Sequence, residues 1–420
     1  MFNQGGLSLE QAPPISVVLR FFVTGAVFGL VGGILLLFYG ESVFDPATQQ
    51  AKILTHTLAL GVMASFMIGA LFQMLPVIAG VVLQTPAKKA MFVHVGFVLG
   101  VISLLSAFYT QNRSFFLIAT LFLGITLLYT VGIMIYNLFK LKNHSSSSKG
   151  MLFALLGFGI TVLMAIYMTT TLGGIHEGSS FFTAKEIHYS FGLFGWIALL
   201  IISISFQVVE MFYVTPAYPK YITSYLVPFI FILLVIKSLF LNSYASYIDI
   251  FIALLLIIYA FITIHRLYKR KRPTSDATVW LWRFGMGVLI FSMIFFISGV
   301  FIDNIILHKL SYIFFAYFAL SVIFAMTYKI VPFLVWFHLS NQGYMKAPLM
   351  HDIVHPKKVK THFYIHVFSF ILWLFSFISP IFFVLASCVV ILLFGWVLYH
   401  LLFAVYTYRH TQKHSEKISW

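Results

Sequence analysis

The chain has 420 residues, of which 61% are hydrophobic and 9% are charged, and its formal net charge is +15. Its mean hydropathy is +0.99. The chain is therefore too apolar to fold as a water-soluble globular protein. The single cysteine, Cys388, excludes an intramolecular disulfide and any metal site built from several cysteines.

Apolar segments long enough to cross a bilayer follow one another along the chain. About 20 helical residues cross the roughly 30 Å hydrocarbon layer. We expect twelve spans, at residues 15–40, 52–76, 90–110, 114–139, 151–172, 186–212, 222–241, 245–268, 279–302, 308–336, 361–379 and 381–407. The first lacks the basic region and cleavage site of a signal peptide, so we expect a retained helix. The sequence thus predicts an all-α integral membrane protein, with residues 1–420 as one polytopic domain in the lipid bilayer.

Basic residues predict the orientation, because Lys and Arg accumulate in cytoplasmic loops. With a cytoplasmic N-terminus, the inner loops hold most of them, including the run at 266–272. The outer side holds five, namely Lys52, Arg113, Lys185, Lys237 and Lys309. Twelve spans then return the C-terminus to the cytoplasm. We interpret the positive charge as a topology signal for a bacterial inner membrane, and not as a sign that nucleic acid is a partner.

Three of the predicted spans share a pattern. Each opens with a histidine and closes 16 to 20 residues later on an aromatic residue, a Gln or Lys, two aliphatic residues and a Pro or Glu. The opening histidines are His56, His188 and His308, and the closing motifs begin at Phe72, Phe206 and Tyr328. The closing motifs stand 134 and 122 residues apart, which is four spans each time. The sequence therefore predicts three quasi-equivalent groups of four helices, at about 15–139, 151–268 and 279–407.

The three histidines are candidate metal ligands. A histidine in or near hydrocarbon costs free energy unless a partner satisfies its polar atoms, so its presence there indicates a functional role. A neutral imidazole gives one nitrogen to a metal while an acceptor orients the other, and two facing imidazoles bind a haem between them. The alternative is an interfacial side chain bonded to water or to a carbonyl. Likewise, the small residues that follow each histidine either make room for a ring or let helices approach closely.

This helix plan resembles the catalytic subunit I of the haem-copper oxidases, which has histidines at the outer ends of helices two, six and ten. The segment HTLALGVMASFMIGALFQMLPVIAG, residues 56–80, is similar to the NnrS-type membrane proteins. The resemblance implies that His56 and His308 bind a low-spin haem and that His188 binds copper. It also implies a partner that donates electrons, or a subunit of a respiratory complex.

The chain departs from the oxidases where they reduce oxygen. The helix around His308 has no second histidine, the seventh helix has no histidine pair, and no tyrosine follows His188 in an HPEVY-like pattern. A complete binuclear site is therefore not expected, although an oxidoreductase remains possible. We expect a one-haem protein that acts in electron transfer or in the response to nitric oxide or another diatomic gas. The alternative is a cofactor-free transporter or a respiratory-complex assembly factor with the same helix plan.

A second set of histidines precedes the eleventh predicted span. Its members are His338, His351, His355, His362 and His366. Two pairs are spaced i, i+4, which places both rings on one face of a helix, as copper or zinc ligands require. The alternative is a solvated cytoplasmic loop, because Pro356 and three nearby lysines interrupt the segment. For His400, near the inner end of the last span, packing or snorkelling is the expected role.

Overall fold

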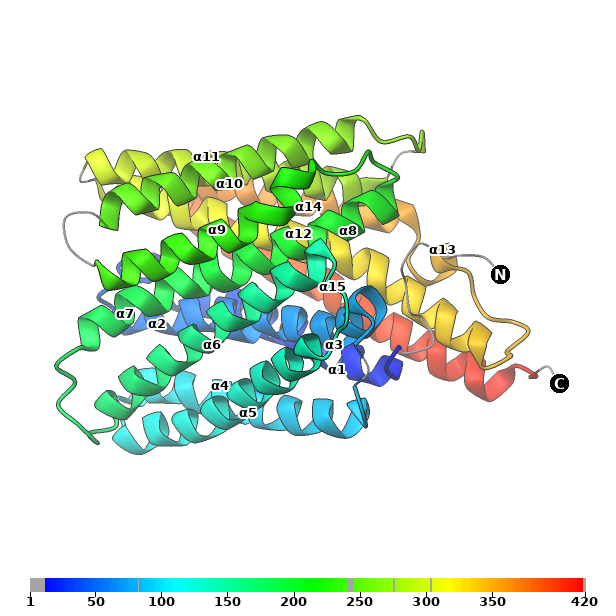
Figure 1. The fold of residues 1–420 in the computed structure, drawn as a ribbon, viewed down its shortest axis with the longest axis horizontal. Helices are drawn as coiled ribbons and strands as arrows, with labels where there is room; N and C mark the ends of the chain where they lie inside the picture. Colours follow the sequence, from blue (N-terminus) through cyan, green and yellow to red (C-terminus); the bar gives the residue numbers. More distant parts are fainter. Residues whose placement is uncertain (1–11, 82, 241–244, 275, 303, 418–420) are drawn as a thin grey trace. The chain divides into compact units, whose positions relative to one another are not determined.

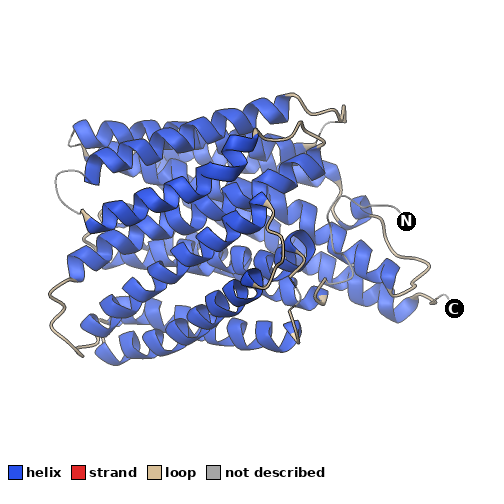
Figure 2. Ribbon diagram, viewed as in Figure 1, coloured by secondary structure: helices blue, strands red, loops and turns tan. Residues whose placement is uncertain are grey.

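The structure is a computed structural model that describes residues 12–81, 83–240, 245–274, 276–302 and 304–417. These residues form helices joined by loops, and no β-sheet is found among them (Figure 2). The chain divides into two compact units. The first unit consists mainly of residues 74–274 and 283–319, and the second of residues 13–73, 275–282 and 320–420.

The first unit is built around α6, which packs against α5, α8 and η4, while α4 packs against α5. The elements that lie wholly in this unit are α4 (Pro86–Thr110), α5 (Arg113–Phe139), α6 (Ser146–Leu172), α7 (Phe181–Ser190), η4 (Phe191–Ala198), α8 (Leu199–Tyr213), α9 (Lys220–Leu239) and α10 (Ala245–Tyr268) (Figure 1).

In the second unit, α1 packs against α15 and η3, and α14 packs against α15. The elements wholly in this unit are α1 (Ile15–Tyr39), η2 (Gly40–Phe44), α2 (Gln49–His56), η3 (Thr57–Ala64), α13 (Met350–Ile353), α14 (Pro356–Phe375) and α15 (Pro380–His414). Three further helices contribute residues to both units: α3 (Ser65–Ala79), α11 (Ala277–Phe301) and α12 (Ile305–Asn341).

Eleven of the twelve predicted spans are confirmed as helices that are long and apolar enough to cross a membrane. The chain is therefore a multi-pass membrane protein whose surroundings are lipid. The remaining span, predicted at 361–379, forms α14 but is not among the eleven. Its physical difference is composition, because the first two turns of α14 carry Lys357, Lys358, Lys360 and His362.

Two of the histidine-bearing spans contain a π-helix. Segment η3 covers Thr57–Ala64 and segment η4 covers Phe191–Ala198. The two are 134 residues apart at both ends, which is also the spacing of the closing motifs at Phe72 and Phe206. The π-helices therefore occupy the same place in the first two predicted groups. In the third group, α12 is an uninterrupted α-helix.

Glycines set the packing of both π-helices. Gly61 and Gly195 are equivalent under the 134-residue offset. A Cβ on Gly61 would lie 2.7 Å from the Phe28 ring, so the ring occupies the space that a side chain would need. In the first unit, a Cβ on Gly157 of α6 would overlap the carbonyl oxygen of Gly195. The helices in each unit thus touch backbone to ring or backbone to backbone, as small residues permit in membranes.

We predict that Gly157→Ala destabilises the protein by about 1–3 kcal/mol. The added methyl would overlap the carbonyl oxygen of Gly195, and a backbone atom cannot rotate away as a flexible side chain can. The matched control is Gly132→Ala on α5, where a Cβ would meet nothing within 4 Å and alanine favours the helix. Thermal unfolding in detergent, followed by size-exclusion chromatography, compares the two variants. Equal melting temperatures for them would contradict the close contact between α6 and η4.

Candidate functional site

His56 ends α2 directly before the η3 π-helix, in the second unit. Its side chain is half-buried, and its Nδ1 lies 2.8 Å from the carbonyl oxygen of Lys52, one turn earlier. A carbonyl oxygen can only accept, so the proton lies on Nδ1 and Nε2 carries the lone pair of the neutral ring. This is the tautomer that a metal-binding histidine with an orienting acceptor requires.

His188 and His308 both belong to the first unit. The Nδ1 of His188 lies 2.9 Å from the carbonyl oxygen of Thr161 on α6, so this ring is also protonated on Nδ1. The ring of His308 packs against Gly299, where a Cβ would come within 2.9 Å of the His308 Cε1 atom. The predicted haem pair, His56 and His308, thus draws one residue from each unit, and the haem stays a prediction.

The three histidines do not occupy equivalent positions. When the closing motifs are superposed, His56 corresponds to Ser190 and Tyr312, and His308 corresponds to Glu186 and Lys52. His188 falls between these two sets of equivalent positions. The repeat therefore places two polar side chains one helical turn apart near the N-terminal end of each span, and their chemistry differs from group to group.

A buried ionic cluster occupies these positions in the first unit. Lys237 of α9 is only 2% exposed, and its Nζ lies 2.8 Å from Asp249 Oδ1 of α10 and 3.7 Å from Glu186 Oε1 of α7. The same ammonium donates to Ser190 Oγ at 3.1 Å and lies 5.6 Å from the centre of the Tyr189 ring. An ammonium buried in a membrane span needs this pairing, and such a group marks a functional position by default.

Sequence reasoning assigned Lys237 to the outer surface as one of five topology residues and therefore missed the cluster. The sequence does contain one sign of the cluster, which is Asp249. It is one of eleven acidic residues in the chain and falls inside an apolar span. A carboxylate in such a segment needs a cation. The sequence does not say which lysine supplies it.

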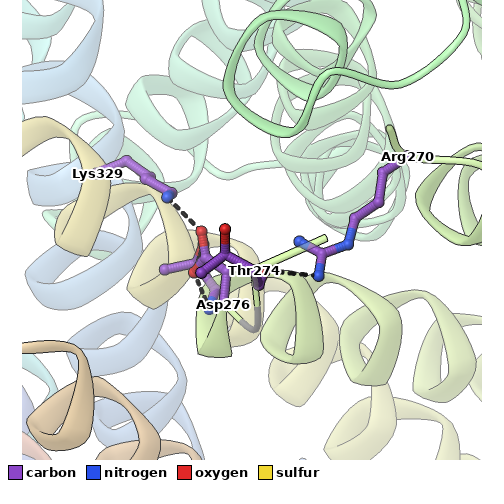
Figure 3. Close-up of polar contacts among 5 residues, drawn as sticks. Arg270, Thr274, Asp276 and Lys329 are labelled. Atoms are coloured by element: carbon purple, nitrogen blue, oxygen red, sulfur yellow. Dashed lines mark hydrogen bonds and ion pairs between the residues drawn. The ribbon is translucent and has the colours of Figure 1, made fainter. Parts of the chain in front are cut away.

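A second ion pair lies in the second unit, where Lys329 of the third closing motif meets Asp276 at 2.5 Å (Figure 3). Asp276 also accepts hydrogen bonds from the Thr278 N–H at 2.9 Å and the Thr278 hydroxyl at 2.7 Å, at the start of α11. Burial opposes ionisation of Asp276, but Lys329 and the two hydrogen bonds outweigh it and hold its pKa below the ordinary value.

The histidines at 338–366 do not form one metal site. His351 and His355 are exposed, and His355 caps α14 by accepting from the Lys357 N–H at 3.2 Å. His362 and His366 are instead fully buried on α14. Within the described residues, no group of three or more His, Cys, Asp or Glu side chains is arranged to hold a metal ion. The solvated-loop alternative therefore holds for part of the segment, and the buried pair belongs to the core of the second unit.

We predict that Lys237→Met destabilises the protein by about 3–5 kcal/mol, because it leaves the buried Asp249 carboxylate without its cation. The double variant Lys237→Met/Asp249→Asn should regain most of the loss, since it removes the stranded charge. The control is Lys185→Met, an exposed lysine on α7. Melting temperatures in detergent test this, and a double variant no more stable than Lys237→Met would argue against the pairing.

For Asp276, a lowered pKa means that the ion pair stabilises the folded state above the ordinary aspartate pKa of about 3.9 and stops doing so as pH falls through the lower folded value. Asp276→Asn should therefore reduce the melting temperature at pH 7 and weaken its fall between pH 5 and pH 3. The exposed Glu177→Gln variant should keep the wild-type pH profile. Parallel profiles for wild type and Asp276→Asn would contradict this.

Comparison of the sequence with protein-family models and with curated proteins finds no match.

Proposed function

We propose that the chain is a membrane haem protein that binds one haem through His56 and His308. In this proposal it acts in electron transfer or in binding a small diatomic gas such as nitric oxide. Bound haem would supply a redox-active iron, and the chain would supply the two axial imidazoles and an apolar surrounding. A copper ion at His188 belongs to the same proposal.

The observation that carries the proposal is the orientation of His56. Its Nδ1 is held by the carbonyl oxygen of Lys52 at 2.8 Å, so in the neutral ring the proton lies on Nδ1 and Nε2 is the nitrogen with the lone pair that iron requires. The position of the ring, directly before a π-helix, adds support, because π-helical segments recur at functional sites. His188 shares the Nδ1 contact to a backbone carbonyl, at 2.9 Å.

The helix plan of the proposal has twelve spans in three groups of four, as in subunit I of the haem-copper oxidases, within a bacterial inner membrane. Helix α14 is then the remaining span, the eleventh in chain order. Its 20 residues have the required length, and it packs against α15 after a turn at Ser376–Ser379. With the N-terminus in the cytoplasm, as the basic loops indicate, twelve spans would return the C-terminus to the same side. The paired π-helices at a 134-residue offset support the grouping.

A second candidate function, proton- or ion-coupled transport without a cofactor, is favoured by the Lys237 cluster. Buried ionisable residues in spans line ion or proton pathways in many membrane proteins. Glu186 is 32% exposed, whereas Lys237 is 2% exposed, so the cluster connects a buried ammonium with an accessible carboxylate. A role as an assembly factor for a respiratory complex shares this cofactor-free class.

An absorption spectrum of the purified protein separates the two functions. Under the haem proposal, wild-type protein shows a Soret band, and His56→Ala or His308→Ala abolishes or strongly shifts it, because an axial ligand is lost. The control is His351→Ala, whose side chain is 60% exposed on α13. Pyridine haemochrome analysis and metal quantitation identify the haem and any copper.

A colourless, monodisperse and thermally stable wild-type protein would overturn the haem proposal. Proton flux in proteoliposomes that is lost in Lys237→Met and kept in Lys185→Met would then establish the second function.

A further inference from the structure

Helix α15 is longer than a membrane span requires. Its 35 residues extend over about 52 Å, whereas the hydrocarbon layer is about 30 Å thick. Residues 380–408 include no Asp, Glu, Lys or Arg, and the first charged residues of the helix are Arg409 and Lys413. The last turns of α15 therefore lie at the level of the lipid headgroups, and the apolar part of the helix lies in the hydrocarbon.

The segment that follows α12 holds these last turns in place within the second unit. Gln342 donates from Nε2 to the Tyr408 hydroxyl at 2.8 Å, and Gln412 donates from Nε2 to Gln342 Oε1 at 2.8 Å. The backbone N–H of Met345 donates to the carbonyl oxygen of Glu416 at 3.2 Å. Because these contacts fix one face of the helix end, they also set where the side chains of the other face lie.

The other face carries an open pocket of about 380 Å³. On the side of the apolar span it is lined by Leu402, Val405 and Tyr406, and on the C-terminal side by Arg409, Lys413 and two histidines. Its wall is mostly apolar, and both basic side chains are exposed at its edge. Among the described residues, no acidic side chain lines it. The pocket thus has an apolar part and a cationic part.

The two histidines and Tyr406 form a stack along the helix. The ring centres of Tyr406 and His410 lie 5.5 Å apart, and those of His410 and His414 lie 4.3 Å apart with their planes 27° from parallel. His414 is oriented further, because its Nδ1 donates to the carbonyl oxygen of His410 at 3.0 Å. The three rings therefore form a continuous wall that joins the apolar part of the pocket to the cationic part.

We propose that this pocket binds an anionic phospholipid, with its phosphate at Arg409 and Lys413 and the upper part of an acyl chain against Leu402, Val405 and Tyr406. Arg and Lys bind phosphate oxygens through charge-assisted hydrogen bonds. The apolar wall argues against a free anion, because inorganic phosphate would leave that wall in water, whereas a lipid covers it. The order of the two parts also matches a lipid in the bilayer, since the apolar part lies toward the hydrocarbon.

Native mass spectrometry of the detergent-solubilised full chain tests the proposal, with phosphatidylglycerol and phosphatidylcholine of identical acyl chains as probes. We expect wild type to bind phosphatidylglycerol more tightly. The variant Arg409→Gln/Lys413→Gln should bind one phosphatidylglycerol fewer and need about 25-fold more lipid to regain it, because each basic residue contributes roughly fivefold. The matched control is Lys417→Gln, which removes a charge on the packed side, where Lys417 lies 5.0 Å from the centre of the Tyr344 ring.

Three outcomes would overturn the lipid site. Equal retention of the two lipids by wild type would show that the headgroup charge is not recognised. A loss in Lys417→Gln as large as in the double variant would show diffuse attraction to the helix end. Displacement of the lipid by equimolar inorganic phosphate would show that the acyl chain contributes nothing.

Melting temperatures give a second readout. Without lipid, we expect equal values for wild type and both variants, because all three basic side chains are exposed. Added phosphatidylglycerol should raise the melting temperature of wild type and Lys417→Gln more than that of Arg409→Gln/Lys413→Gln, because only the first two keep the site. An equal rise in all three proteins would contradict the proposal, whatever the absorption spectrum shows about haem.

Discussion

Lipid offers no hydrogen bonds, so every polar group inside a span must find its partner within the protein. This constraint explains the all-helical architecture, since a helix satisfies its own backbone. It also explains why polar side chains turn back to nearby carbonyls, as Thr57 does to Ile53 at 2.8 Å and His56 does to Lys52. Where local partners are absent, as for Lys237, side chains from other helices converge.

The two units meet this constraint in different ways. In the first unit, an ammonium is surrounded by carboxylates and a hydroxyl, and the cost of burying one charge is offset by another. In the second unit, the buried polar side chains include serine and threonine hydroxyls, the amide of Gln73 and the imidazoles of His362, His366 and His400, which need only hydrogen bonds. Lys329 is the exception there, and its carboxylate partner Asp276 stands directly before α11.

Much of the fold could be predicted from the sequence, because hydropathy and helix length are read directly from composition. Eleven spans are confirmed on this basis, and α14 differs because its lysines dilute an apolar segment of marginal length. The π-helices could not be predicted, since glycines such as Gly61 and Gly195 are equally compatible with closely packed α-helices. For the site, the sequence singled out three histidines, but the pairing of Lys237 with Asp249 is a tertiary contact without a local signature.

The uninterrupted course of α12 has a practical consequence. A π-helix accommodates more residues in each turn than an α-helix does, so the side chains before and after it no longer follow a single 3.6-residue period. A helical wheel drawn through residues 49–79 or 181–213 therefore assigns one end of the span to the wrong face. The same drawing through α12 is valid, because α12 is α-helical throughout and has Tyr317 where the other two spans have glycine. Among the three histidine-bearing spans, positions for labels or cross-linkers can therefore be chosen by simple counting in α12 alone.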